Sequence, residues 1–189
     1  HGILRVVRPS SDPVRTVTML PRGRGLGVTW SVPEERHTYS KGYFDDMVCR
    51  AMGGRVAEKI VFGHLNSGAA NDLEQATSIA RRMVREWGMS EAIGPMAWSG
   101  SQQVFLGEDL MTQGREYSDE TAKLVDSEIF RILHEQEARA TEVLLKYRPA
   151  LELVAEALLE RETIDGAEVA QLVQASLDHV QVTEDAHIE

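Results

Sequence analysis

The chain has one cysteine, Cys49, among its 189 residues. A single thiol can form neither an intrachain disulfide nor a zinc site built from cysteines, so a packed core must stabilise the fold. Aromatic residues make up only 6% of the chain, but 42% of the residues are hydrophobic, which excludes a wholly disordered protein. No hydrophobic run approaches the roughly 18 residues that a membrane-spanning helix needs. No signal peptide is visible at the start.

Basic residues are also scarce, with 20 Lys and Arg against 30 Asp and Glu, for a formal net charge of −10. This balance argues against duplex nucleic acid as the main partner, because phosphate binding requires a surplus of positive charge. The Gly-x-x-x-x-Gly-Lys-Ser/Thr loop of many nucleotide-binding proteins is missing. The six histidines include no His-x-x-x-His pair, so the chain holds no complete helical zinc motif.

The hydrophobic spacing predicts a mainly α-helical fold with a small β-hairpin element. Alternating residues predict the two strands of the hairpin, which a loop at residues 21–25 joins. Residues 89–117 are irregular and long for a loop, which is typical of a functional segment. We expect one domain over residues 1–180 and a disordered tail over 181–189. The predicted strands cover 14–20 and 26–32, and the predicted helices cover 1–8, 40–62, 70–87, 118–147, 149–161 and 165–177.

Two local features of the sequence are unusual. Gly53 and Gly54 interrupt an otherwise apolar helical stripe, which indicates close approach of another backbone. Residues 66–72 are small and polar and lead into a helix. The plain interpretation is a loop with a capping box formed by Asn71 and Glu74. Alternatively, Asp72 is a metal ligand, because a short carboxylate at a helix start is well fixed.

Several ordered blocks resemble the peptidase domain of the FtsH family, whose members are membrane-anchored, ATP-dependent zinc metalloproteases. The resemblance covers about residues 1–178, and its clearest part is the Ser-Gly-Ala-Ala-Asn-Asp-Leu block at 67–73. Each block alone would be a weak signal, but their order makes the match specific. The other blocks lie at 21–27, 53–58, 62–63, 80–90, 104–107 and 118–122.

The resemblance implies where the metal ligands lie. The family holds zinc with a His-Glu-x-x-His helix and a distant aspartate, and Asp72 matches that aspartate. His1 stands where the second histidine belongs, or it is the last residue of a tag. The first histidine and the general-base glutamate would then precede His1, so the chain itself would contain no catalytic residue. Glu58 matches a glutamate near the site, where it would orient a histidine.

The resemblance also implies a wider function. The parent protein would be a zinc metalloendopeptidase that degrades unfolded or misassembled polypeptides as a homo-hexamer. Zn²⁺ is the expected cofactor here, whereas ATP and Mg²⁺ would bind only a separate ATPase module. Separate segments would anchor the parent at the cytoplasmic face of the bacterial inner membrane, and the fragment alone would be soluble and inactive. The alternative is a non-catalytic helical scaffold or oligomerisation domain that kept the fold but not the site.

Overall fold

The computed structural model describes residues 1–8, 12–20, 27–32, 38–98 and 117–185, with the backbone alone from residue 178 onward. Its elements confirm the predicted mainly helical fold with a small β element. The predicted loop at 21–25 lies outside the described residues, as do residues 186–189 of the predicted tail and most of the predicted 89–117 segment. In chain order the elements are α1 (Gly2–Val7), β1 (Val14–Thr18), β2 (Val28–Ser31), α2 (Lys41–Phe62), the 3₁₀ turn η1 (Ser67–Ala69), α3 (Ala70–Arg85), α4 (Asp119–Lys146), α5 (Arg148–Arg161), β3 (Thr163–Asp165) and α6 (Gly166–Asp185).

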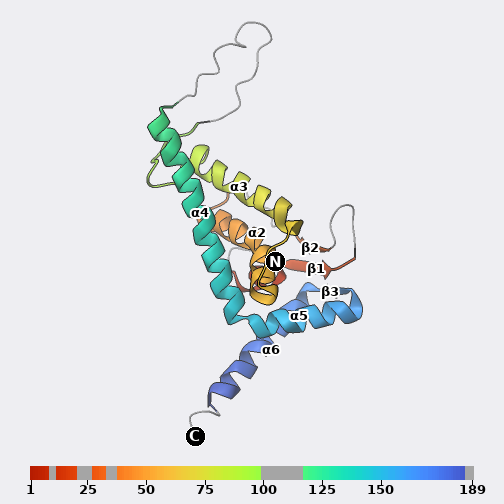
Figure 1. Ribbon diagram of the computed structural model, residues 1–189. Helices are drawn as coiled ribbons and strands as arrows, with labels where there is room; N and C mark the ends of the chain where they lie inside the picture. Colours follow the sequence, from red (N-terminus) through yellow and green to blue (C-terminus); the bar gives the residue numbers. More distant parts are fainter. Residues whose placement is uncertain (9–11, 21–26, 33–37, 99–116, 186–189) are drawn as a thin grey trace.

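The long helix α4 runs along one side of the molecule, and α2 and α3 pack against it and against each other (Figure 1). Local signals explain the bounds of α2. The hydroxyl of Ser40 accepts a hydrogen bond from the backbone N–H of Tyr43 at the start, and Gly63 ends the helix in a left-handed conformation. Across the described segments, no helix is both long and apolar enough to cross a membrane.

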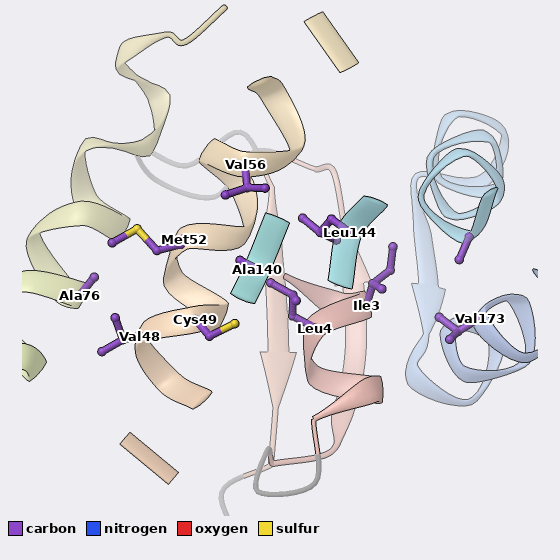
Figure 2. Packing of buried hydrophobic residues seen from close by; sticks show 11 residues of the cluster. Ile3, Leu4, Val48, Cys49, Met52, Val56, Ala76, Ala140, Leu144 and Val173 are labelled. Carbon is purple, nitrogen blue, oxygen red and sulfur yellow. The ribbon is translucent and has the colours of Figure 1, made fainter. Parts of the chain in front are cut away.

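The short helix α1 is anchored in the main hydrophobic core. Figure 2 shows Ile3 and Leu4 in the middle of this cluster, between side chains of α2 on one side and Val173 of α6 on the other. Leu4 is fully buried, and full burial of one such side chain stabilises a fold by about 1.5–3 kcal/mol. The core therefore fixes the start of α1, and with it His1. The buried members are Ile3, Leu4, Val48, Cys49, Met52, Val56, Ala76, Ala140, Leu144, Ala150 and Val173.

The sheet has three strands rather than the two of the predicted hairpin. Its order is β2-β1-β3, and both pairings are antiparallel. The segment that forms β3 was expected only to separate two helices, because three residues are too few to show alternation. Ile164 of β3 pairs with Val17 of β1 and is almost completely buried. The core beneath the sheet therefore stabilises this short strand.

Helix α3 starts where the sequence predicts, but its cap differs from the prediction. The helix begins at Ala70, and its N-cap residue, Ala69, makes no side-chain hydrogen bond. The predicted capping box of Asn71 and Glu74 is therefore wrong. Asn66 supplies the local cap instead, because its Oδ1 accepts a hydrogen bond from the N–H of Gly68 at 2.7 Å. The 3₁₀ turn before α3 moves the cap upstream and leaves Asp72 in the first helical turn.

The last helix, α6, is longer than predicted. It continues to Asp185, beyond the expected end at residue 177 and past the domain boundary expected at residue 180. Its start follows the prediction, since the N–H of Glu168 donates to Oδ1 of Asp165 at 2.8 Å.

Candidate metal centre

His1 and Asp72 lie close together in space although they are far apart in the sequence. Nε2 of His1 is 3.3 Å from Oδ2 of Asp72, and each side chain is about one-third exposed, at 34% and 33%. The first residue comes from the start of α1, which the core anchors, and the second from the first turn of α3. The two metal ligands predicted from the sequence therefore face each other across an accessible gap.

The backbone of α2 fixes the orientation of the His1 ring. Nδ1 of His1 lies 2.8 Å from the carbonyl oxygen of Arg50. A carbonyl oxygen only accepts hydrogen bonds, so Nδ1 carries the proton and donates it. In the neutral ring, the lone pair of Nε2 then points toward Asp72. A hydrogen bond like the one from Nδ1 to the Arg50 carbonyl is what orients histidine ligands in metal sites.

The site attracts a positive charge. Burial disfavours the charged form of His1, but Asp72, through its hydrogen bond and its negative charge, and the Arg50 carbonyl outweigh it. The pKa of His1 is consequently raised above its ordinary value. Two lone-pair donors at this distance need either a proton or a metal ion between them. Because a metal requires the neutral ring, metal binding would displace that proton.

The paired glycines of α2 make room for His1. A Cβ atom on Gly54 would lie 2.8 Å from Nε2 of His1, and one on Gly53 would lie 2.7 Å from Cδ1 of Leu4. The backbone nitrogen of His1 would be only 3.3 Å from that Gly53 Cβ. The predicted close approach of another backbone is therefore confirmed, and α1 is the element that approaches.

Glu58 lies one helical turn after Gly54 and on the same face of α2. Its Oε1 accepts a hydrogen bond from Nδ2 of Asn66 at 2.9 Å. Its Oε2 is buried and has no hydrogen-bond partner among the described residues. The described contacts join Glu58 to Asn66 and not to His1, so its predicted role in orienting a histidine stays a prediction.

The two donors fit zinc in kind and in spacing. Imidazole nitrogen and carboxylate oxygen are both ligands that zinc takes in proteins, and two ligands of a tetrahedral ion at about 2.0–2.1 Å lie about 3.3 Å apart. Catalytic zinc sites use three protein ligands. Over the described ranges, no three His, Cys, Asp or Glu side chains come together, so His1 and Asp72 form two-thirds of such a set.

Two cavities flank His1. One, of about 370 Å³, is mainly apolar and extends toward Leu144, Val154 and Leu158. The other, of about 430 Å³, extends between α1, α2 and α3. Both are bordered by His1 and by residues 27–29, which include the start of β2. Strand β2 is at the edge of the sheet that the described residues form, and the candidate centre lies beside this strand.

Sequence reasoning missed the arginines of the second cavity. Arg5 and Arg50 both line it, and the Arg50 carbonyl also holds His1. The two residues stand far apart in the sequence, and no local pattern marks either of them. Only the packing of α1 against α2 brings them together.

Known proteins are similar to this chain over most of its length. Residues 1–172 match Peptidase family M41. An ATP-dependent zinc metalloprotease FtsH of Acidimicrobium ferrooxidans is 57% identical over 180 residues, which are 95% of this chain and 27% of that protein. FtsH 3 of Symbiobacterium thermophilum is 44% identical over 179 residues, or 94% of this chain and 28% of the relative.

A third relative, the ATP-dependent zinc metalloprotease FtsH of Thermotoga maritima, is 42% identical over 183 residues, which are 95% of this chain and 30% of that protein. The chain thus spans less than a third of the length of these relatives. The matched region includes both His1 and Asp72. The chain belongs to Peptidase family M41.

Proposed function

We propose that the chain is the peptidase domain of an ATP-dependent zinc metalloendopeptidase, in which His1 and Asp72 bind the zinc ion. The observation that carries this proposal is the 3.3 Å separation of Nε2 of His1 and Oδ2 of Asp72, with the ring held by the Arg50 carbonyl. The names of the relatives support the choice of zinc. We further propose that Oε2 of Glu58, which is buried and has no hydrogen-bond partner among the described residues, accepts an N–H from a further histidine ligand.

When bound, zinc would lower the pKa of a coordinated water toward about 7 and polarise a peptide carbonyl. The described residues supply the metal-binding and positioning groups. His1 presents Nε2 because the Arg50 carbonyl fixes its ring, and Asp72 presents Oδ2 from the first turn of α3. The glutamate that takes a proton from the attacking water is expected before His1.

The surroundings of the pair suit an extended polypeptide. An added strand can hydrogen-bond to the open edge of β2, which would bring its backbone past His1. The 370 Å³ cavity beside this edge would take an apolar side chain. Unfolded or misassembled proteins expose both features, so we propose them as the substrates.

The whole protein would be larger than this chain. We propose that it contains an ATPase module that binds ATP and Mg²⁺, a membrane anchor at the cytoplasmic face of the bacterial inner membrane, and a homo-hexameric assembly. The length and the names of the relatives support the ATPase module. Exposed apolar side chains on α4, among them Phe130 and Leu145, support packing between subunits.

The test is degradation of an unfolded protein such as casein by the zinc-loaded full-length protein in the presence of ATP. We expect the Asp72→Asn variant to lose degradation, because the amide keeps the shape of the side chain but not its charge. The control is Glu74→Gln, which removes one charge from an exposed position on the same helix. Retained degradation in Asp72→Asn would contradict the role of Asp72 as a zinc ligand, whereas no degradation by the wild type would favour the non-catalytic scaffold.

A further inference from the structure

The 430 Å³ cavity is lined by two arginines whose guanidinium groups are not fully paired among the described residues. Arg5 extends from α1 and Arg50 from α2, one turn before the paired glycines. Arg50 is only 6% exposed. A guanidinium group this deeply buried is normally paired with a carboxylate, because an isolated buried charge is costly.

Neither arginine is fully paired. Nε and Nη1 of both side chains are buried and have no hydrogen-bond partner among the described residues. Other arginines near α2 behave differently: Asp46 accepts from Arg8 at 2.9 Å and from Arg139 at 3.4 Å. The fold thus pairs Arg8 and Arg139 with an acidic residue of α2. It leaves Nε and Nη1 of Arg5 and Arg50 without a partner among the described residues.

The nearby carboxylates are engaged elsewhere. Asp12 accepts a hydrogen bond from the hydroxyl of Tyr43 at 3.1 Å, and Asp72 faces His1. The pKa of Arg5 is lowered by its burial and by the charge of Arg50, although Asp12 opposes the change. The side chains that line the cavity include the cations of Arg5 and Arg50 and the single carboxylate of Asp72, which is an excess of positive charge.

We propose that Arg5 and Arg50 form a subsite that binds a carboxylate of the substrate, beside the bond to be cleaved. The planar guanidinium fork matches a carboxylate in shape and offers paired hydrogen bonds. The subsite shares His1 and residues 27–29 with the apolar cavity, so a peptide lying along β2 would place one side chain in each. The substrate preferred by this chain therefore carries an acidic group a short distance from an apolar residue. This inference rests on the proposed function.

Matched peptides test the subsite in the zinc-loaded full-length protein. Short quenched fluorogenic peptides with amidated C-termini carry one Glu, which is moved stepwise through the positions around a central Phe, and each has a Gln counterpart. At one position we expect kcat/KM for the Glu peptide to exceed that of the Gln peptide by about tenfold or more. A Gln peptide with a free C-terminus tests whether the carboxylate comes from the chain end instead.

Variants assign the preference to the arginines. Arg50→Gln, which keeps the backbone carbonyl that holds His1, should bring kcat/KM for the Glu and Gln peptides to within about twofold of each other. Arg5→Gln, at a less buried position, should do the same and serves if Arg50→Gln does not fold. The control Arg82→Gln removes an equal charge from an exposed ion pair with Glu86 and should keep the preference.

The outcomes separate this subsite from the protease itself. Cleavage of both peptides with no preference at any position, and none for the free C-terminus, would overturn the subsite and leave the proposed function standing. If the wild type cleaves no peptide, the proposed function fails, and fluorescence anisotropy with labelled peptides then decides the subsite. Tighter binding of the Glu peptide that Arg50→Gln abolishes would support it, and equal binding would overturn it.

Discussion

At the scale of single residues, the site depends on the absence of a Cβ atom at one glycine of α2. Gly54 has no Cβ, and the Nε2 atom of His1 occupies the space beside it. Alanine is a better helix former than glycine by about 1 kcal/mol, so local helix stability favours replacing this glycine. The glycine therefore serves the position of His1 and not the stability of α2.

The Gly54→Ala variant should separate folding from metal binding. We expect the thermal midpoint to stay close to that of the wild type or to rise, because the helix gains propensity. Zinc content should fall strongly, because the new Cβ would lie 2.8 Å from Nε2 and displace the ring. Calorimetry and metal analysis of the purified protein measure the two effects. Gly42→Ala, whose Cβ would meet only Ser40 Oγ at 3.8 Å, is the control and should keep its zinc.

The thiol of Cys49 has low reactivity because the core buries it. It is completely buried, and this burial raises the pKa of its thiol to about 11. At about pH 8, roughly one thiol in a thousand would be ionised, and the thiolate is the reactive form. We expect iodoacetamide to leave Cys49 unmodified in the folded protein and to alkylate it in urea. Mass spectrometry of the Cys49 peptide measures this, and rapid alkylation in the folded state would contradict the packing of α2.

At the scale of elements, a buried carboxylate ties the segment that follows α3 to α4. Oε2 of Glu128 accepts a hydrogen bond from the hydroxyl of Ser90 at 2.6 Å, and Arg131 donates to Glu128 from the next turn. Arg131, through its hydrogen bond, lowers the pKa of Glu128 most. Burial opposes this effect, and the Ser90 hydroxyl adds to it. The pKa of Glu128 therefore lies below its ordinary value of 4.5.

A lowered carboxyl pKa stabilises the fold at neutral pH, and this stability is lost as the pH falls through the lowered value. We expect Glu128→Gln to reduce the free energy of unfolding by about 1–2 kcal/mol at neutral pH. The gap between wild type and variant should close as the pH falls below 4.5. Urea unfolding across this range tests it, with Glu142→Gln at an exposed position of the same helix as the control. A gap that does not change with pH would refute the assignment of the charge.

The sequence predicts long elements better than short ones. Helices α2 to α5 repeat apolar residues over many turns, and the structure confirms each of them. Strand β3 has three residues and depends on its pairing with β1, which no local pattern can show. The capping box at Asn71 was wrong because an adjacent 3₁₀ turn, capped by Asn66, took over the helix start. Local competition of this kind is decided by small energy differences.

At the scale of the whole molecule, only the site residues that belong to a sequence motif were predicted. His1 and Asp72 followed from the resemblance to known proteases, and the structure brings them together. Arg5 and Arg50 escaped prediction because their proximity arises only from the packing of α1 on α2. Glu58 was placed near the site, but its described hydrogen bond goes to Asn66. A distant contact is thus predictable only when a motif already encodes it.

Assembly is a second property of the whole molecule. Phe130 is 64% exposed on the surface of α4, where an apolar side chain gains nothing from contact with water. If α4 packs against a neighbouring subunit in the proposed homo-hexamer of the full-length protein, Phe130→Glu should convert that assembly into smaller species. Analytical ultracentrifugation measures the change, and Gln171→Glu, an exposed substitution on α6, should leave the assembly intact. A hexamer that persists in Phe130→Glu would exclude this face of α4 from the interface.

The most direct test of the account is to locate zinc in the full-length protein. Anomalous diffraction at the zinc absorption edge, from crystals of the zinc-loaded protein, shows the ion without reference to activity. We expect one site per subunit, with the ion at about 2.0–2.2 Å from Nε2 of His1 and from a carboxylate oxygen of Asp72. Zinc bound away from both side chains, or no zinc where these two residues meet, would contradict the central claim.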